Sequence, residues 1–342
     1  MKIAIQGLGV TAGFGCGVDA FRTALQQGSV PENYRADVSG LAEFIPKRAL
    51  RRIDHFSKMT LLGACLALKD ADLLEADRSR MGVVIASGYG ALKTTFNFLD
   101  SYLDFGYSCS SPTHFSNSVH NAAAAHVSIQ LKTTAPSLTV TQFEMSVPSA
   151  LLSAQQWLAE GRVDQVLFGA VDEACDVLSY CREQFFGDGE QGPLQPFNFE
   201  EQSAVAGEGA VFFVLSRGDD DAPYGYIEAV RLGNYLANPV TLPENDRLII
   251  GADGHKECGR WYQQLLKGRQ AASYSPLYGS FPAAAGFDLA VAALSQCDGE
   301  LYASPATANA VSVLPPQPVG TAPLSCLKLG PGGDYSLIRL SG

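Results

Sequence analysis

An acidic residue stands where a strand pattern turns directly into a helix pattern. Leu138 and Val140 predict a buried strand, and an apolar helical period begins at Pro148, a residue tolerated in a first helical turn. Glu144 lies between the two patterns, at or just before the helix start. The free N–H groups there stabilise an anion by about 0.3–1 kcal/mol and lower the pKa of a nucleophile. Glu144 is therefore either a site residue or the ordinary surface acid of a helix start.

Burial would make a charge at this turn expensive. An ionised carboxylate buried without a partner costs several kcal/mol. We therefore expect Glu144 to be bound by N–H groups of the helix start or by a cation such as an arginine.

The composition predicts a globular, acidic chain. Its 342 residues are 46% hydrophobic and 17% charged, which is enough for a sizeable buried core. A net charge of −11 disfavours binding to nucleic acid, to anionic membranes and to acidic proteins, because each needs clustered lysine and arginine. The eight cysteines are scattered without zinc spacing, so we expect no metal. The start of the chain lacks a long apolar segment, and the expectation is a soluble cytoplasmic protein.

Elements alternate between strand and helix patterns along the chain, which predicts an α/β fold. We expect the segment 107–118 to be polar and irregular, and the helix after it to begin at Val119. A strand that ends in a glycine turn at Gly7, Gly9 and Ala12 is expected within 2–12. Further strands are expected at 81–87, 138–141, 163–170, 210–215, 226–232 and 248–250, and helices at 18–27, 54–73, 119–131 and 148–158.

A nucleotide site is one possible function of the N-terminal glycines. Gly7, Gly9 and Ala12 satisfy the relaxed Gly-x-Gly-x-x-Ala pattern after a strand. The signal is weak, because a dinucleotide fingerprint opens a helix directly and here the helix waits until Val18. A nucleotide-dependent oxidoreductase is therefore the third choice of function.

Two motifs carry a resemblance to a known family. Residues 135–146, Ala-Pro-Ser-Leu-Thr-Val-Thr-Gln-Phe-Glu-Met-Ser, fit the frame Gly-Pro-Ser-x-Ser-x-x-Thr-Ala-Cys-x-Ser, and residues 207–210 keep its Gly-Glu-Gly-Ala. The chain thus resembles the β-ketoacyl synthases. The resemblance implies a thiolase-like α/β fold with layers α-β-α-β-α and two pseudo-repeated halves, 1–217 and 218–342. The second half is short between Asn238 and Asp246, so we expect a reduced cap.

The family's catalytic residues are replaced in this chain. The position of the nucleophilic cysteine falls on Glu144, and a carboxylate cannot form the thioester of condensation. The two histidine positions fall on Asp253 and Ser280, although a shift of the register could place His255 at the first of them. The lysine position falls near Ser275. The resemblance therefore implies no catalytic residues and no cofactor.

Other positions of the resemblance imply structural or interface roles. Asn121 and His126 match an asparagine and a histidine that look structural. His114, Phe115 and Ser118 are our candidates for side chains that reach a partner's acyl tunnel; the alternative is an ordinary ordered loop. Structural roles are expected for a tight glycine loop and its hydrogen-bonding acid, which are Gly207, Glu208 and Gly209.

Replaced catalytic residues together with retained structural motifs are typical of chain length factors. These are the inactive partner subunits of type II polyketide and aryl-polyene ketosynthases, which the chain resembles. The expected function is a heterodimer with an active ketosynthase whose tunnel this chain shapes. An acyl carrier protein would dock mainly through that partner. The alternative is a stand-alone decarboxylase or hydrolase that uses Glu144 and Asp253 as an acid and a base.

Overall fold

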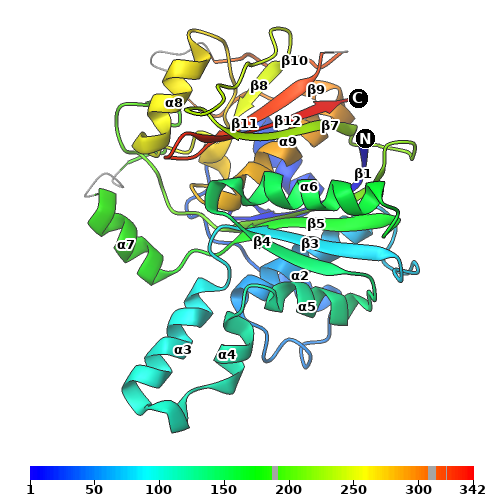
Figure 1. Ribbon diagram of the computed structural model, residues 1–342, viewed down its shortest axis with the longest axis vertical. Helices are drawn as coiled ribbons and strands as arrows, with labels where there is room; N and C mark the ends of the chain where they lie inside the picture. The colour runs from blue at the N-terminus through cyan, green and yellow to red at the C-terminus, as the bar shows by residue number, and fades with distance from the viewer. Residues whose placement is uncertain (187–191, 307–312, 321) are drawn as a thin grey trace.

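The computed structural model describes residues 1–186, 192–306, 313–320 and 322–342. One mixed sheet organises the fold, in the order β4-β3-β5-β6-β1-β7-β12-β11-β8, with β2 paired to β1 (Figure 1). Its strands are β1 (Ile3–Ala12), β2 (Gly15–Cys16), β3 (Met81–Ser87), β4 (Ser137–Thr141), β5 (Gln165–Asp172), β6 (Gly209–Arg217), β7 (Tyr226–Asn234), β8 (Arg247–Ile250), β11 (Leu324–Leu329) and β12 (Asp334–Ser341). A separate pair joins β9 (Glu300–Leu301) to β10 (Gln317–Pro318).

The helices begin and end close to the predicted boundaries. The Asp54 carboxylate caps the second helix by accepting a hydrogen bond from the Ser57 N–H (2.9 Å), as its place before the apolar period indicates. The helices are α1 (Val18–Gln27), α2 (His55–Asp70), α3 (Leu92–Phe105), α4 (Pro112–Ser118), α5 (Ala122–Leu131), α6 (Ser146–Ala159), α7 (Asp176–Phe186), α8 (Lys256–Leu266) and α9 (Ala285–Asp298).

The layers follow the predicted α-β-α-β-α order. Helices α2 and α5 cover one face of the strands β1 and β3–β6, and α6 contacts the opposite face. Helix α9 contacts β5 and β6 from that same face and also β8, β11 and β12, so α6 and α9 form the middle layer (Figure 1). Helix α8 packs on β11 from outside. The two parts of the sheet meet only where β1 pairs with β7, at Ile3–Ile227 and Ala4–Tyr226.

Alternation along each strand divides its side chains between the middle core and one of two outer cores. In β6, Val211 and Phe213 face the middle layer, whereas Phe212 and Val214 face α2 and α5. The predicted division at residue 217 coincides with the end of β6. However, the middle core combines residues from both sides of that division, so the two-domain description and the reduced cap stay predictions.

The N-terminal glycines lie inside a strand, so the expectation of a glycine turn there is wrong. β1 continues through Gly7 and Gly9 to Ala12. A Cβ on Gly9 would lie 2.2 Å from the Gly63 carbonyl oxygen, and one on Gly7 would lie 2.7 Å from the Ala67 carbonyl oxygen. These glycines therefore let α2 approach the sheet closely. The geometry removes the argument for a nucleotide at this position.

The segment 107–118 also differs from expectation. It contains the helix α4, which begins at Pro112 behind the capping Ser111 hydroxyl, and α5 begins at Ala122 rather than at Val119. Proline at the first helical position and serine at the cap are both helix-start signals, which the polar composition obscured. Together α3 and α4 project from the body of the molecule (Figure 1).

Candidate functional site

A tight turn between β4 and α6 presents Glu144. Phe143 has a positive φ of 45°, which is uncommon for a residue with a side chain. The Ser146 hydroxyl fixes the turn, since it accepts a hydrogen bond from the Gln142 N–H (2.7 Å) and contacts the Ser87 carbonyl oxygen (2.9 Å). The sequence thus predicts the position of Glu144 correctly, between a strand and a helix start.

The three residues at the vacated catalytic positions border one cavity. Glu144 comes from the β4–α6 turn, Asp253 from the segment after β8, and Ser280 from the segment before α9. The cavity has a volume of about 220 Å³. It is lined by Tyr89, Glu144, Arg182, Phe185, Asp253, His255, Glu257, Cys258, Ser280, Phe281, Pro282 and Pro331.

Asp253 is held as a buried anion between two basic groups. The Lys328 ammonium donates to its Oδ2 (3.0 Å), and His255 Nδ1 lies 2.9 Å from its Oδ1. Burial alone would raise the pKa of Asp253, but the charges of Lys328 and His255 outweigh it and hold this pKa far below its usual range. The same ion pair raises the pKa of Lys328 against the effect of burial. Asp253 and Lys328 are therefore both ionised.

Ser280 has a structural hydroxyl. It donates to the Asp253 carbonyl oxygen (2.6 Å) and accepts from the Val205 N–H (3.0 Å). Both bonds are made by a fully buried side chain. Ser280 therefore connects the wall of the cavity to the segment before Gly207.

Glu144 does not find the partner that we expected. Among the described residues, it takes part in no hydrogen bond and in no ion pair, although it is half-buried at the cavity. In the described structure no N–H group of α6 donates to its carboxylate, and the Ser146 hydroxyl at the helix start accepts from the Gln142 N–H instead. The expectation of helix-start donors or an arginine partner is therefore wrong.

Comparisons with known proteins agree with this geometry. The family described as "Beta-ketoacyl synthase, N-terminal domain" matches residues 20–221, which is more than half of the chain. The chain belongs to the β-ketoacyl synthase family. A putative polyketide beta-ketoacyl synthase 1 of Streptomyces virginiae is 26% identical over 63% of this chain and 57% of its own length. A chloroplastic 3-oxoacyl-[acyl-carrier-protein] synthase I of Hordeum vulgare is 22% identical over 63% of this chain and 52% of its own.

Solved structures show the same fold over the whole chain. A beta-ketoacyl synthase from Burkholderia phymatum aligns with a TM-score of 0.80 at 14% identity, over 99% of both chains. The ishigamide ketosynthase/chain length factor aligns with a TM-score of 0.79 at 18% identity, over 99% of this chain and 98% of that one. These structural alignments establish the thiolase-like ketosynthase fold. The chain spans about half the length of the curated relatives that it matches.

Within this family fold, the sequence missed the buried lysine of the site. We placed the lysine position near Ser275, but the side chain that reaches Asp253 is Lys328, in β11. The Ser275 hydroxyl instead donates to the Ala252 carbonyl oxygen (2.8 Å). A signal was present, because Lys328 lies between Leu327 and Leu329 in an apolar strand, where a lysine must be paired.

His255 also belongs to the cavity, as the shifted register allowed. Its Nε2 lies 3.4 Å from the Arg182 guanidinium, which donates to the Ser280 carbonyl oxygen (3.1 Å). Asp253 and His255 therefore both border the cavity. The structure does not single out one of them as the residue at the family's first histidine position. Arg182 is a further site residue that the sequence did not indicate.

The glycine loop is closely packed, and its acid is buried and hydrogen bonded. The Glu208 carboxylate accepts hydrogen bonds from the N–H groups of Ala36 and Ala174 (both 3.0 Å) and lies 2.9 Å from His55 Nε2. A Cβ on Gly207 would lie 2.2 Å from the Tyr278 carbonyl oxygen. Gly209 is similarly crowded by Thr11 O and Phe287, both 2.7 Å from such a Cβ. The loop thus passes directly beneath the segment that carries Ser280.

The two residues expected to be structural around α5, His126 and Asn121, differ in their contacts. His126 Nε2 lies 3.0 Å from the Asn117 side-chain oxygen, and the Asn117 amide donates to the Arg52 carbonyl oxygen (2.7 Å). His126 therefore connects α5 to α4. Asn121, in contrast, is exposed and its side chain does not cap α5.

The tunnel candidates lie on α4, in the projecting part of the molecule. Phe115 is 57% exposed and packs on Phe98 of α3, with ring centroids 5.3 Å apart. His114 and Ser118 are partly buried, and the Ser118 hydroxyl donates to the Phe115 carbonyl oxygen (2.9 Å). None of these three residues lines the cavity in this chain.

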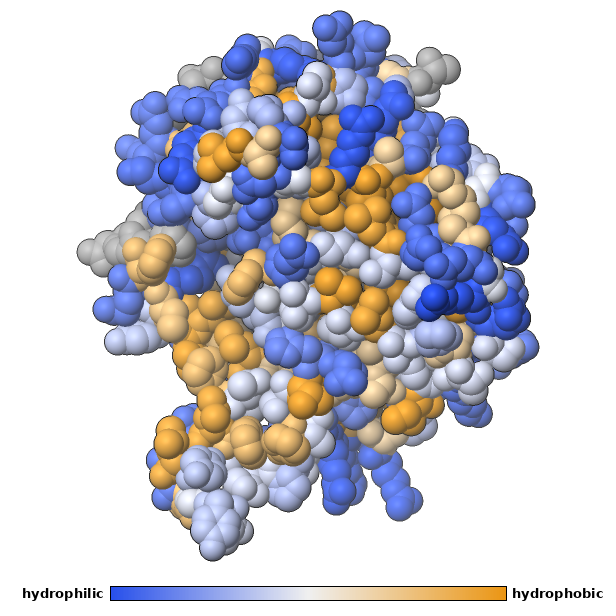
Figure 2. Space-filling model, viewed as in Figure 1, coloured by the Kyte–Doolittle hydropathy of each residue, from blue (hydrophilic) through white to orange (hydrophobic). Residues whose placement is uncertain are grey.

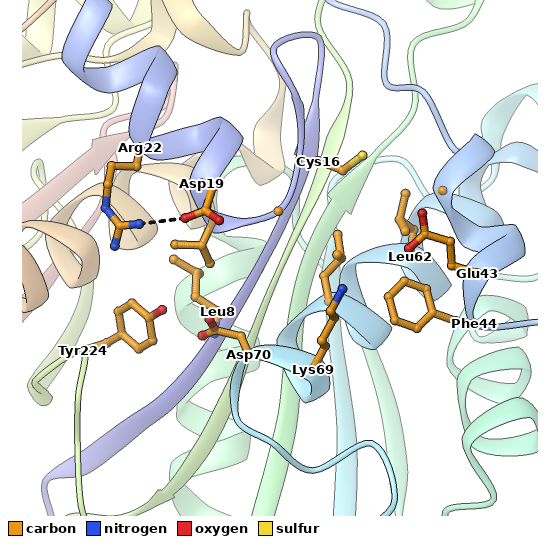
Figure 3. A pocket seen from close by; sticks show the side chains of 14 residues that line it. Leu8, Cys16, Asp19, Arg22, Glu43, Phe44, Leu62, Lys69, Asp70 and Tyr224 are labelled. Carbon is orange, nitrogen blue, oxygen red and sulfur yellow. Dashed lines mark hydrogen bonds and ion pairs between the residues drawn. The ribbon is translucent and has the colours of Figure 1, made fainter.

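A larger groove lies beside α1 and α2, away from the cavity (Figure 3). Two of its charged groups have partners: Arg22 pairs with Asp19 (3.0 Å) and with Asp298 beside the groove (2.9 Å), and Asp70 accepts from the Leu8 N–H (2.9 Å). In the described part of the chain, no group of three histidine, cysteine or acidic residues could hold a metal ion. None of the described helices has the length and apolar character needed to cross a bilayer.

Proposed function

We propose that this protein is a chain length factor, a partner subunit without condensing activity that pairs with an active ketosynthase. The observation that carries the proposal is Glu144 at the cavity, in the turn that presents the family's nucleophilic cysteine. A carboxylate in that turn cannot hold the growing chain as a thioester. The Ser280 hydroxyl donates a hydrogen bond to the Asp253 carbonyl oxygen, and the Asp253 carboxylate forms an ion pair with Lys328.

The surface supports a partner at the projecting helices. Large apolar side chains are exposed along α3, the following turn and α4, and Figure 2 shows them gathered on this part of the molecule. We call residues 92–119 the aromatic arm. Contiguous apolar surface of this kind is characteristic of an interface. Its exposed members are Leu99, Tyr102, Leu103, Phe105, Tyr107, Phe115 and Val119.

An open strand edge lies on the same side of the fold. β4 ends the sheet, and among the described strands it pairs with β3 alone. Unpaired edges are usually covered or paired. A second ketosynthase-like subunit would cover the edge and the aromatic arm together, and an interface that does so is expected to bury roughly 2,000 Å² or more.

We further propose that the arm helps to shape the partner's tunnel through Phe115, His114 and Ser118, during chain elongation of the type II polyketide or aryl-polyene kind. A solved ketosynthase/chain length factor supports this by its similar fold. The net charge of −11 supports docking of an acidic acyl carrier protein mainly through the partner subunit.

The hydrolase or decarboxylase alternative is weaker because of Asp253. That mechanism needs one carboxylic acid with a raised pKa, whereas Lys328 and His255 keep Asp253 ionised. The remaining carboxylate, Glu144, would have to act without a second acid.

Co-expression tests the proposal. The protein is produced alone and together with the ketosynthase encoded beside it, and each preparation is measured by size exclusion and native mass spectrometry. We expect a one-to-one complex only on co-expression, and unstable or insoluble protein otherwise. A stable homodimer that ignores the ketosynthase would overturn the proposal, as would condensing activity of this chain alone.

A further inference from the structure

Phe143 has a backbone conformation that its place in the fold does not explain. Among the described residues, a positive φ without a glycine occurs at Asp72, Lys132, Phe143 and Lys267. Lys132 and Lys267 are the C-caps of α5 and α8, and Asp72 lies directly after the C-cap of α2, where a left-handed residue is common. Phe143 stands instead between a strand and a helix start, where a φ of 45° is strained for a bulky side chain.

Hydrogen bonds around the turn hold Phe143 in this conformation. The Ser146 hydroxyl accepts from the Gln142 N–H (2.7 Å) and lies 2.7 Å from the Phe143 carbonyl oxygen. The Ser149 hydroxyl donates to the Gln142 side-chain oxygen (2.6 Å). Backbone strain persists only where the surrounding structure fixes the residue, and it is commonly found at functional sites. The turn therefore indicates a function for the Phe143 side chain.

The Phe143 ring gains little stabilisation from its own chain. It is 60% exposed, and it does not line the cavity. Its ring contact in the described structure is with Tyr89, edge-on at a centroid distance of 6.0 Å. Burial of a phenyl ring is favourable, so the burial that this chain does not provide is left to a second molecule.

Phe143 lies between the open strand edge and the aromatic arm. Thr141, two residues before it, ends β4, whose outer edge is unpaired in the described structure. On the other side, Tyr89 precedes Gly90, and a Cβ on Gly90 would lie 2.7 Å from Cδ2 of His120, directly after the arm. A subunit that covers both the edge and the arm would therefore cover Phe143 as well.

The open edge also limits what the second molecule is. Its main-chain N–H and C=O groups are satisfied by a strand of another folded chain, not by a small ligand. The ketosynthase subunit of the proposed function is such a chain.

We propose that Phe143 is an anchor residue of the subunit interface, and that its ring inserts into an apolar pocket of the ketosynthase subunit. This inference rests on the proposed function and adds to it a residue outside the aromatic arm. A few aromatic side chains carry most of the binding energy of an interface, and a side chain that is already fixed loses little entropy on binding. The strain in the free chain thus keeps the ring in the orientation that the partner needs.

Two substitutions separate the ring from the strain. Phe143→Ala removes the ring and keeps a side chain at the positive φ, whereas Phe143→Gly removes both. We expect both variants to raise the dissociation constant of the purified heterodimer at least tenfold, measured by native mass spectrometry on serial dilution. In urea unfolding of the chain, Phe143→Gly should have a higher midpoint than Phe143→Ala, although glycine usually destabilises.

Leu236→Ala is the control, because Leu236 is 73% exposed and lies away from the arm, and it should assemble like the wild type. Assembly of both Phe143 variants within about twofold of a wild type that does assemble would overturn this inference and leave the proposed function intact. A wild type that forms no complex would overturn both. If Phe143→Ala does not fold, the dissociation constant of Phe143→Gly decides.

Discussion

The Lys328 ammonium lies 3.0 Å from the Asp253 carboxylate, and both side chains are buried. The pair joins β11 to the segment after β8 beneath the cavity. Loss of one partner leaves an uncompensated buried charge, which typically costs 3–5 kcal/mol. We expect Lys328→Met to lower the free energy of unfolding by about that amount in urea denaturation. The exposed Lys256→Met is the control and should stay within about 0.5 kcal/mol.

Removal of both charges tests whether the lost stability comes from the unpaired buried charge. The double variant Asp253→Leu with Lys328→Met should recover most of the stability lost by Lys328→Met alone, because apolar replacements of buried ion pairs are often neutral. Equal loss in the single and double variants would show that the pair is not the cause.

Glu173 should make stability depend on pH. Burial raises the pKa of Glu173 to about 7, and its carboxylate accepts a hydrogen bond from the Lys93 N–H (2.9 Å) at the start of α3. Between about pH 4.5 and 7 the folded state keeps a proton that the unfolded state has released, so the free energy of unfolding falls as pH rises. Glu173→Gln should flatten this fall and be more stable than wild type at pH 8 by about 2–3 kcal/mol.

Urea denaturation at pH 5 and at pH 8 measures the Glu173 effect. Asp172, whose pKa burial raises to about 6, should keep part of the dependence in the variant. The exposed Glu43→Gln provides the comparison and should follow the wild-type profile. An unchanged slope in Glu173→Gln would contradict the assignment.

Gly9→Ala should destabilise the fold without affecting any nucleotide. The added methyl group would meet the Gly63 carbonyl oxygen at 2.2 Å and the Ala67 nitrogen at 2.3 Å. We expect a loss of about 2–3 kcal/mol in thermal or urea unfolding, from overpacking between β1 and α2. Gly40→Ala is the control, because its Cβ would approach no atom closer than 3.9 Å. NADH should leave the tryptophan fluorescence of both proteins unchanged.

Substitutions on the aromatic arm should separate assembly from folding. Leu103 and Phe115 are 75% and 57% exposed, so Leu103→Ser with Phe115→Ser should leave the unfolding midpoint nearly unchanged. The same double variant should weaken the complex with the ketosynthase at least tenfold in a co-expression pull-down. Leu236→Ser, at an equally exposed position away from the arm, should assemble normally. Normal assembly of the arm variant would argue against this surface as the interface.

Glu144→Ala should leave the partner's chemistry intact. The side chain has no partner to lose within the described structure, so the complex should form as before or somewhat more weakly. Turnover of the assembled complex, measured with malonyl-carrier substrate, should stay within about twofold of wild type. Complete loss of turnover in an intact heterodimer would show that Glu144 takes part in catalysis.

The sequence by itself determined the local structure and the family. The apolar periods predict the longer strands and the helices α1, α2, α5 and α6, and the motif around Glu144 places it at a helix start. The retained Gly207, Glu208 and Gly209 predict a tight loop with a hydrogen-bonding acid, because a glycine requirement is local and is visible in the residue types.

Only the tertiary structure decided which distant residues meet. Lys328 pairs with Asp253 across 75 positions, and Glu208 contacts His55 across 153, since sheet order rather than spacing sets these distances. Likewise, Gly7 and Gly9 match a nucleotide pattern, but the packing of α2 on β1 explains them. Glu144, Asp253 and Ser280 border one cavity for the same reason, because the groups that reach a cavity are fixed by the packing of elements from the whole chain.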